Sequence, residues 1–599
     1  MIRWICNIAA LCLMVTVAYS QQASVVKEIL IRGNVRVSKE AILAAMRTKV
    51  GKPYVQDDLD RDKKSLEDLG FFSAVDVRAT PSDLNAYQVT VDLQEWPVIK
   101  EFRVTGNTVV SRDEILKAIT MKVGDVFNLN ARHSSVDAIA AAYDKKHYAL
   151  AGIDDFAPLP DSPGTIDIVI VELKVGTVST QGNVRTKDWV MRRLIKTRAG
   201  DVYNEDKWAK DVTRIHNTNW FDSVQAKRED VSPEPGKVNR NLIAEVKEAK
   251  TGQFNVGVQL DPDSSLAGLI RLSENNLYGT GKSVALNLTQ AISGGGPSVD
   301  LNYTNPFYDA KDTTMQTSVY SRLVYRFGSS FFGTSSPINS STQYSERHSG
   351  FSLGFVRPIT DQVSLGVSGR LENVITNNTG ATPLNSFVQQ DGDIGMLGFS
   401  ATRDRRDVNT DTSRGDFSRF LFEPGYSDIT RVGGATADNN ILGSNFFTKT
   451  TLEYRKYWAP GQKPRDLDFE SPRRVIAFRA RYGFVNGRIP YFDQFFAGGP
   501  DSLRGYDPDR FWGTQELLFS MEYRHPLQKS FDLIFFVDYG GAWGGYGTVN
   551  NYTQSTVFQM HLGFGPGLSF KTPFGQICVD LGFNENGKTQ PDFRIGNSF

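Results

Sequence analysis

Two hydrophobic patterns divide the chain near residue 250. Upstream, short alternating segments are interleaved with stretches whose apolar residues recur every three or four positions, which predicts strands mixed with amphipathic helices. Downstream the helical spacing disappears, and apolar residues alternate with polar ones, as at Phe254, Val256 and Val258. Such alternation is typical of strands with one apolar and one polar face. We therefore expect an α+β region followed by an all-β region.

The first region contains a threefold repeat. A Gly-Asn pair recurs at Gly33, Gly106 and Gly182, at intervals of 73 and 76 residues, and another glycine follows each pair 18 residues later. Within each repeat the pattern predicts strand, helix, helix, strand, strand. Identical offsets indicate repeated modules, which we place at 23–96, 97–174 and 175–249. Because His147-Tyr148 lies four residues later than the matching aromatic pairs, the second helix of the second repeat should be about one turn longer.

The rest of the chain, 250–599, predicts a membrane barrel. Strand-sized segments recur about every 22 residues, which gives about 16 strands, within the even-numbered range of outer-membrane barrels. Short connections alternate with longer ones rich in Gly, Ser and Asn, as periplasmic turns alternate with external loops. We expect an antiparallel 16-stranded transmembrane β-barrel.

Residues 1–20 predict a secretory signal peptide. Arg3 supplies a positive charge, residues 4–17 form an apolar core, and Ala18-Tyr19-Ser20 is a small-x-small cleavage site. An N-terminal membrane anchor is the alternative, but the apolar stretch is short. After cleavage Cys578 would be the one remaining cysteine, so no intramolecular disulfide is expected.

Composition and motifs give little indication of catalysis. Lys+Arg and Asp+Glu balance at 67 each, which does not favour a nucleic-acid partner. The six histidines are scattered without metal-ligand spacing, and Gly279–Ser283 lacks the first glycine of a phosphate loop. We expect no enzyme, no cofactor and no metal. The glycine-rich run 563–567 is expected to lie between strands, where it would form a bend.

One loop stands out within the barrel region. Its paired glycines permit a tight turn, and its arginine presents a planar cation beside an aromatic ring. An arginine fork bound by carboxylates makes a rigid, directional contact. Taken alone, the segment is best interpreted as an ordinary polar surface loop. The residues of this motif, which falls in the sixth long connection, are Gly498, Gly499, Leu503, Arg504, Gly505 and Tyr506.

With the threefold repeat and the barrel pattern around it, this loop resembles the signature loop of the BamA-like outer-membrane protein assembly factors. Their periplasmic POTRA domains have the β-α-α-β-β order, and the resemblance covers nearly the whole mature chain. It implies that the loop folds into the barrel lumen and that Glu522 and Asp538 bind Arg504. The chain end resembles the family's last strand and its C-terminal β-signal, with a kink at Gly596; the matching residues are Phe593, Ile595, Gly596 and Phe599.

The resemblance also implies a function. POTRA domains would capture unfolded β-barrel proteins by strand addition, and a weak seam between the first and last strands would template their insertion into the outer membrane, without nucleotide hydrolysis. The implied partners are unfolded clients and outer-membrane lipid, with accessory periplasmic lipoproteins and chaperones as further candidates. Two alternatives stay open: a TamA-like translocation and assembly module, which also has three POTRA domains, and a two-partner secretion exporter, which usually has two. A passive porin would need neither the repeat nor Arg504.

Overall fold

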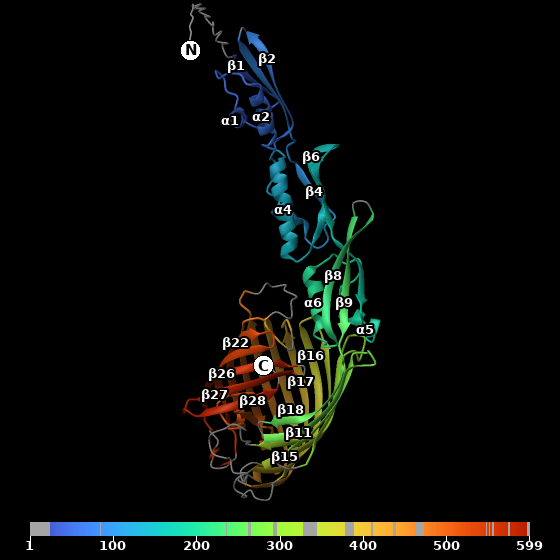
Figure 1. The fold of residues 1–599 in the computed structure, drawn as a ribbon, viewed down its shortest axis with the longest axis vertical. Helices are drawn as coiled ribbons and strands as arrows, with labels where there is room; N and C mark the ends of the chain where they lie inside the picture. The colour runs from blue at the N-terminus through green and yellow to red at the C-terminus, as the bar shows by residue number, and fades with distance from the viewer. Residues whose placement is uncertain are drawn as a thin grey trace, which may run out of the picture. The chain divides into compact units, whose positions relative to one another are not determined.

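The structure is a computed structural model, and Figure 1 shows its ribbon. It describes residues 24–83, 85–234, 237–261, 265–291, 296–326, 344–377, 388–408, 411–434, 439–461, 472–546, 548–549, 552–553, 556–572 and 575–595. The expected signal peptide, Gly596 and Phe599 lie outside these ranges. The chain divides into two compact units: Met1–Thr177 with Ala199–Glu205 and Glu229–Asn241, and Val178–Arg198 with Asp206–Arg228 and Leu242–Phe599.

Each of the three repeats folds as a three-stranded sheet with two helices, which confirms the β-α-α-β-β order. The last strand of each repeat lies in the centre, with sheet orders β1-β3-β2, β4-β6-β5 and β7-β9-β8. α4 has 17 residues, whereas α2 and α6 have 12, so the second helix of the second repeat is longer as predicted. The elements are β1 (Val25–Arg32), α1 (Lys39–Ala45), α2 (Gln56–Glu67), β2 (Phe72–Asp83) and β3 (Ala86–Glu95); then β4 (Glu101–Thr105), α3 (Arg112–Ala118), α4 (Leu129–Lys145), β5 (Leu150–Leu159) and β6 (Ser162–Glu172); then β7 (Lys174–Gln181), α5 (Asp188–Leu194), α6 (Glu205–His216), β8 (Phe221–Glu234) and β9 (Lys237–Glu248).

The recurring Gly-Asn pair has a structural cause. Each of the three glycines has a positive φ, and a Cβ there would overlap a carbonyl oxygen of the central strand; they are Gly33, Gly106 and Gly182. Two residues beyond that carbonyl, a glutamate accepts backbone N–H groups from the loop after the glycine; these acceptors are Glu95, Glu172 and Glu248. The repeat is therefore a folding device in which glycine lets the loop approach the sheet and glutamate satisfies its amides.

Each repeat also has its own apolar core. Ile42, Leu66 and Val89 are fully buried in the first repeat. The second and third repeats bury larger aromatic residues, including Phe156 and Trp208, both at 0% exposure. The helices of each repeat thus pack against one face of its sheet through apolar side chains.

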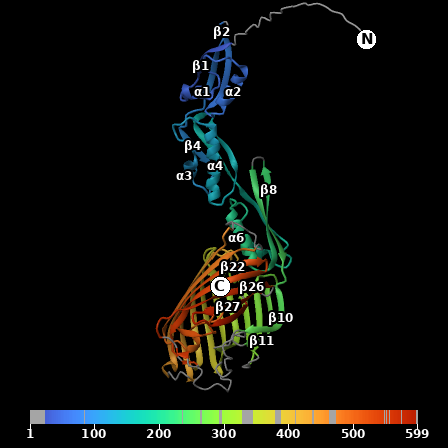
Figure 2. The same cartoon turned by 60° about the vertical axis from the view of Figure 1, so that its left-hand side comes forward.

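The barrel region forms one antiparallel sheet in which strands follow each other in chain order. Figures 1 and 2 show part of this wall, with β22, β26 and β27 labelled in succession. The sheet has 17 described strands, but the three-residue β21 (Phe495–Ala497) belongs to a loop and pairs with β22 beside β20. Sixteen wall strands remain, which confirms the expected fold class. They are β10 (Gly252–Asp261), β11 (Ser265–Leu277), β12 (Lys282–Ala291), β13 (Ser298–Asn305), β14 (Thr314–Arg326), β15 (Tyr344–Pro358), β16 (Val363–Asn377), β17 (Val388–Asp404), β18 (Gly415–Gly434), β19 (Gly443–Trp458), β20 (Val475–Gly487), β22 (Phe511–Gln528), β23 (Phe531–Gly544), β26 (His561–Thr572), β27 (Gly575–Asn584) and β28 (Thr589–Ile595).

The alternating sequence separates two environments in this wall. In β22, Glu516 and Glu522 are fully buried on the lumen side. Met521 and Tyr523, which flank Glu522 in the sequence, are exposed on the other side. Phe254 on β10 is 70% exposed on the outer face. An apolar outer face and a polar interior are what a barrel surrounded by hydrocarbon requires. Among the described helices, none combines the length and apolarity needed to cross a membrane.

The first and last wall strands meet without a ladder. β10 pairs with β11 and β28 pairs with β27, and although β10 and β28 approach each other, no strand pairing joins them among the residues that the structure describes. The described part of β28 ends at Ile595, which pairs with Ile577. The junction between β10 and β28, called the seam below, is therefore the least hydrogen-bonded part of the described wall.

Candidate functional site: the sixth loop inside the barrel

The connection between β20 and β22, called loop 6 below, is built around a tight turn. Gly498 and Gly499 have φ values of +124° and +83°, and a Cβ at Gly498 would overlap the carbonyl of Asp507. The Ser502 hydroxyl accepts the Gly498 N–H and donates to the Gly498 carbonyl, both at 2.9 Å. Leu503 is fully buried and Tyr506 is 6% exposed. The motif is thus a packed structure and not a polar surface loop.

Arg504 lies buried among carboxylates on the barrel wall. Its Nε and Nη2 donate to the two oxygens of Asp538 at 2.7 and 2.8 Å, and its Nη1 donates to Glu522 at 2.8 Å. The guanidinium also lies 3.7 Å from the centroid of the Phe536 ring. A bidentate fork with a cation–π contact fixes both the position and the orientation of the arginine. The structure thus brings together Arg504, Glu522 and Asp538.

Residues that the sequence analysis missed extend this site to the last two strands. Asp580 on β27 contacts Arg504 Nη1 at 3.2 Å, and Asn584 donates to the Gly505 carbonyl at 2.9 Å. On β28, Asp592 accepts the Gly505 N–H at 3.4 Å, and Arg594 donates to the Pro500 carbonyl at 2.7 Å. Loop 6 therefore contacts the last strand of the wall directly.

The terminal residues proposed from the resemblance do not all fall in the described structure. Phe593 pairs with Val579 between the lumen-facing Asp592 and Arg594. Ile595 continues the ladder through its backbone, and Gly596 and Phe599 lie outside the described residues. The part of β28 that the structure describes thus contacts loop 6 through the two polar neighbours of Phe593.

The glycine-rich run 563–567 was predicted to form a bend between strands, and that prediction is wrong. The run lies inside β26, and its glycines face the lumen, where loop 6 packs. A Cβ at Gly563 would overlap the carbonyl of Arg504, and one at Gly567 would overlap the carboxylate of Asp580. The physical reason for the glycines is close approach of other atoms, backbone carbonyls at Gly563 and Gly565 and the Asp580 carboxylate at Gly567, and not turning.

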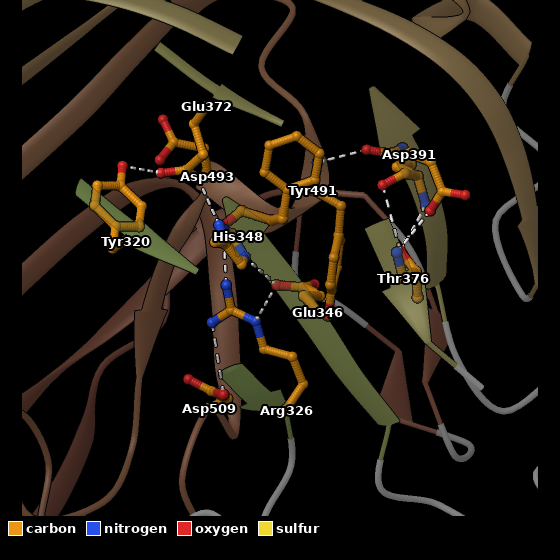
Figure 3. Close-up of polar contacts among 12 residues, drawn as sticks. Tyr320, Arg326, Glu346, His348, Glu372, Thr376, Asp391, Tyr491, Asp493 and Asp509 are labelled. Carbon is orange, nitrogen blue, oxygen red and sulfur yellow. Dashed lines mark hydrogen bonds and ion pairs between the residues drawn. The ribbon is translucent and has the colours of Figure 1, made fainter. Parts of the chain in front are cut away.

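A second group of residues binds the earlier part of loop 6, η3 (Tyr491–Asp493) and β21, and Figure 3 shows it. Arg326 on β14 donates to the Phe492 carbonyl at 2.9 Å and contacts Glu346 on β15 at 3.0 Å. Its guanidinium lies 4.0 Å from the centroid of the Phe496 ring, and Asp509 approaches it to 3.7 Å. Arg326 is 9% exposed.

Neighbouring strands complete this second group, which we call the Arg326 cluster. Arg370 on β16 contacts Asp493 at 3.0 Å, and Lys449 on β19 donates to the Asp493 carbonyl at 2.7 Å. His348 lies between Glu346 and Glu372, at 3.1 and 2.5 Å, as Figure 3 shows. Loop 6 is thus bound at two separate places, by Arg504 near the last strands and by the Arg326 cluster across β14, β15, β16 and β19.

Three small α+β repeats joined to a barrel with a loop packed in its lumen define a class, the POTRA-bearing outer-membrane barrels. The chain belongs to the Omp85 superfamily, because the Omp85 superfamily domain matches residues 276–599. The surface antigen variable number repeat, or POTRA, matches residues 24–95, 97–172 and 173–249. Both matches agree with the resemblance found in the sequence.

Known proteins similar to this chain fall into several groups. The outer membrane protein assembly factor BamA of Neisseria meningitidis serogroup B is 23% identical over 507 residues, covering 78% of this chain and 59% of that protein. Protein TOC75, chloroplastic, of Pisum sativum is 22% identical over 77% of this chain and 60% of that protein. The chain thus spans about three-fifths of the length of these curated relatives. The structure of CdiB from Escherichia coli matches 90% of this chain and 95% of its own, with TM-score 0.51 and 13% identity, which shows a shared fold.

Proposed function

We propose that this protein folds β-barrel proteins and inserts them into the bacterial outer membrane, with its barrel in that membrane and its three POTRA domains in the periplasm. The similarity to BamA assembly factors over most of the chain supports this assignment. The observation that carries the mechanism is the seam, where two neighbouring strands share no described ladder while loop 6 binds one of them.

The seam offers a physical route for insertion. A strand edge facing hydrocarbon leaves N–H and C=O groups unsatisfied, and each such group costs several kcal/mol. An incoming client strand that pairs with the free edge of β10 or β28 removes this cost for itself and for the barrel. The client would then fold strand by strand against a template, with no cofactor or nucleotide required. Local thinning of the bilayer beside a poorly matched seam would lower the barrier further.

The POTRA sheets would bind clients before they reach the seam. In each three-stranded sheet the central strand is hydrogen-bonded to a neighbour on both sides. The edge strands are therefore β1, β4 and β7 on one side and β2, β5 and β8 on the other. The first edge is partly occupied by its own repeat, since Val25, Val98 and Lys174 make isolated bridges to residues 53, 126 and 202. We propose the second edge for strand addition, which uses main-chain hydrogen bonds and suits many different clients.

Arg504 has a supporting role in this mechanism. Through Asp538, Glu522 and Asp580 it connects loop 6 to three wall strands, and Gly505 beside it contacts β28. We propose that this contact holds β28 in a defined position, so that its free edge is presented to a client in one register.

Joining the seam tests the mechanism. In a Cys578→Ser background, which removes the native buried thiol, a cystine between one residue of β10 and one of β28 would close the seam. Insertion of a model barrel protein into liposomes should then fall strongly under oxidising conditions and recover after reduction. Equal insertion rates in both states would contradict the proposal.

Depletion of the protein in cells separates the alternatives. Loss of many outer-membrane barrels supports general assembly, whereas loss of one secreted partner protein would support a two-partner secretion exporter. Affinity purification of the full chain from the same cells would identify accessory lipoproteins or periplasmic chaperones.

A further inference from the structure

The outer face of the barrel carries an apolar groove, distant from the seam in strand order. Its volume is about 550 Å³, within the roughly 300–1,000 Å³ typical of small-molecule sites. Phe420, Leu452 and Tyr482 form one cross-strand row over β18, β19 and β20, and each is 38–43% exposed. Because these side chains point away from the lumen, the groove faces the lipid.

The groove exists because small residues interrupt a wall of large ones. Ala480 lies between Tyr454 and Phe519 in the next cross-strand row, and Ala401 pairs with Phe420. All of these residues line the groove. Large side chains on both sides of two alanines leave a channel along the wall that suits a flexible hydrocarbon chain.

One end of the groove carries an excess of positive charge. Arg403 lines the groove, and it contacts Asp416 at 2.9 Å; Arg405 and Lys456 contact the same carboxylate at 2.5 and 3.8 Å. Asp416 is only 2% exposed, whereas the side chains of Arg403 and Arg405 are 46% and 44% exposed. Among the described residues, no other carboxylate contacts these three cations, so the group has a net charge of +2.

This cationic group lies where a lipid headgroup would be. β17 is the eighth wall strand, so it runs toward the end of the barrel at which the chain enters from the third POTRA domain, and Arg403 is near its last residue. Trp458, 46% exposed, and Tyr454 lie on the same face, and the Lys456 amine is 5.9 Å from the Trp458 ring centroid. Exposed aromatic residues with Lys and Arg mark the membrane–water interface.

We propose that this groove is a binding site for an anionic phospholipid of the periplasmic leaflet. One acyl chain lies along Ala401 and Ala480, and the phosphate contacts Arg403 and Arg405. Guanidinium groups bind phosphate in a bidentate manner, and basic groups beside membrane segments recognise anionic headgroups. The inference rests on the placement of the barrel in the outer membrane and not on the insertion mechanism. It assigns a lipid site to strands on the other side of the wall from the seam.

The test measures lipid binding to the full-length chain in detergent. Phosphatidylglycerol with a photoreactive diazirine in its acyl chain is added, and cross-linked peptides are identified by mass spectrometry. We expect cross-links to concentrate in residues 399–421 and 452–482, and phosphatidylglycerol to bind more tightly than phosphatidylcholine. Labelling spread evenly around the wall, or equal affinity for the two lipids, would overturn the proposal.

Three variants sharpen the test. Arg403→Gln with Arg405→Gln reduces the local charge from +2 to 0, because Lys456 still pairs with Asp416, and should weaken phosphatidylglycerol binding about thirty-fold, roughly five-fold for each arginine. Ala480→Trp should abolish the localised cross-link by filling the groove. The matched control is Arg357→Gln, which removes a similarly exposed arginine paired with Asp309 at the same end of the wall, and should change nothing.

Folding of each variant is checked by heat-modified migration on gels. If the double variant fails to fold, Arg405→Gln, which lies outside the strand, replaces it with an expected five-fold loss. Unchanged affinity in every folded arginine variant would refute the headgroup assignment. Because the readout is lipid binding and not client insertion, failure here leaves the proposed function untouched, and failure of insertion leaves the lipid site untouched.

Discussion

Substituting Arg504 tests the central contact of the candidate site. The side chain is 2% exposed and touches Asp538, Glu522 and Asp580, which are themselves at most 2% exposed. Arg504→Ala takes the bound cation away from Asp538, whereas Glu522 still contacts Arg524 at 2.8 Å and Asp580 still contacts Arg594 at 3.6 Å. Removing one member of a buried ion pair typically costs about 3–5 kcal/mol. Because tenfold corresponds to about 1.4 kcal/mol, the undocked population of loop 6 should rise by roughly two to four orders of magnitude.

Thiol labelling can measure that release. Leu503 is fully buried beside Arg504, so a Leu503→Cys reporter in a Cys578→Ser background should react slowly with maleimide. The reaction should accelerate strongly when Arg504→Ala is added, and client insertion into liposomes should slow. Arg504→Lys should give an intermediate rate, because an ammonium keeps the charge but cannot form the bidentate fork.

Two comparisons control for general damage. Arg488→Ala removes an exposed arginine from the same loop, one that donates to the Asn440 carbonyl at 2.9 Å, and should leave labelling unchanged. Adding Asp538→Asn to Arg504→Ala should recover part of the lost docking energy, because it removes one unpaired buried charge. If Arg504→Ala leaves both the labelling rate and client insertion at wild-type values, the assignment of Arg504 is wrong.

Three further predictions use the same variants and readouts. Gly563→Ala should release loop 6, because the added methyl group would collide with the backbone of Arg504. Gly257→Ala, whose Cβ position has open space around it, should leave loop 6 docked. Equal maleimide labelling of Leu503→Cys in the two variants would contradict the close-packing argument. Arg326→Ala should weaken the earlier part of loop 6 by about 1–3 kcal/mol, so that a Phe492→Cys reporter reacts faster while Leu503→Cys does not; a parallel change at both sites would show that the loop has one anchor and not two. In the second POTRA domain, burial raises the pKa of the Glu172 carboxyl, but hydrogen bonds from Thr108, Val109 and Tyr143 outweigh the effect of burial and lower the pKa below its usual 4.5. A carboxyl whose pKa is lowered in the folded state contributes stability that is complete above the unfolded-state pKa and is lost as pH falls below that value. Hydrogen exchange at residues 106–110, corrected for intrinsic rates, should therefore accelerate as pH falls below about 4.5. Glu172→Gln should remove that acceleration.

The sequence predicted features that depend on local pattern. The equal offsets after Gly33, Gly106 and Gly182 identified three modules, because the same close approach to a central strand demands glycine each time. Alternation identified the wall strands, because each side chain meets either lipid or lumen. Glu522 and Asp538 followed from the resemblance and not from spacing.

Features that depend on barrel closure could not be predicted. Asp580 and Asp592 are ordinary lumen-facing positions in their strands, and only the path of loop 6 brings Gly505 and Arg504 to them. In the sequence, His348 is one of several scattered histidines. Its partner Glu372 is 24 residues away and becomes its neighbour only through strand pairing. The misread glycines of β26 did contain a usable signal: Gly563, Gly565 and Gly567 recur with the period of a strand and therefore share one face.

The two sides of the seam differ in how they are supported, and this difference can be measured. β28 is bound to β27 and also to loop 6 through Asp592 and Arg594, whereas β10 has β11 as its described strand partner. Backbone amides open in proportion to the local free energy of their contacts. Amides of β10 should therefore exchange faster than those of β28 in the wild-type protein.

Loss of Arg504 should reduce that difference. When Arg504→Ala undocks loop 6, the contacts from Gly505 and Pro500 to β28 are lost as well, so exchange in Thr589–Ile595 should accelerate toward the rate of Gly252–Asp261. Exchange in β10 should change little, because its pairing with β11 is intact. A wild-type β28 that exchanges faster than β10, or one unaffected by the substitution, would show that loop 6 does not stabilise this side of the seam, and the proposed presentation of β28 to clients would lose its physical basis.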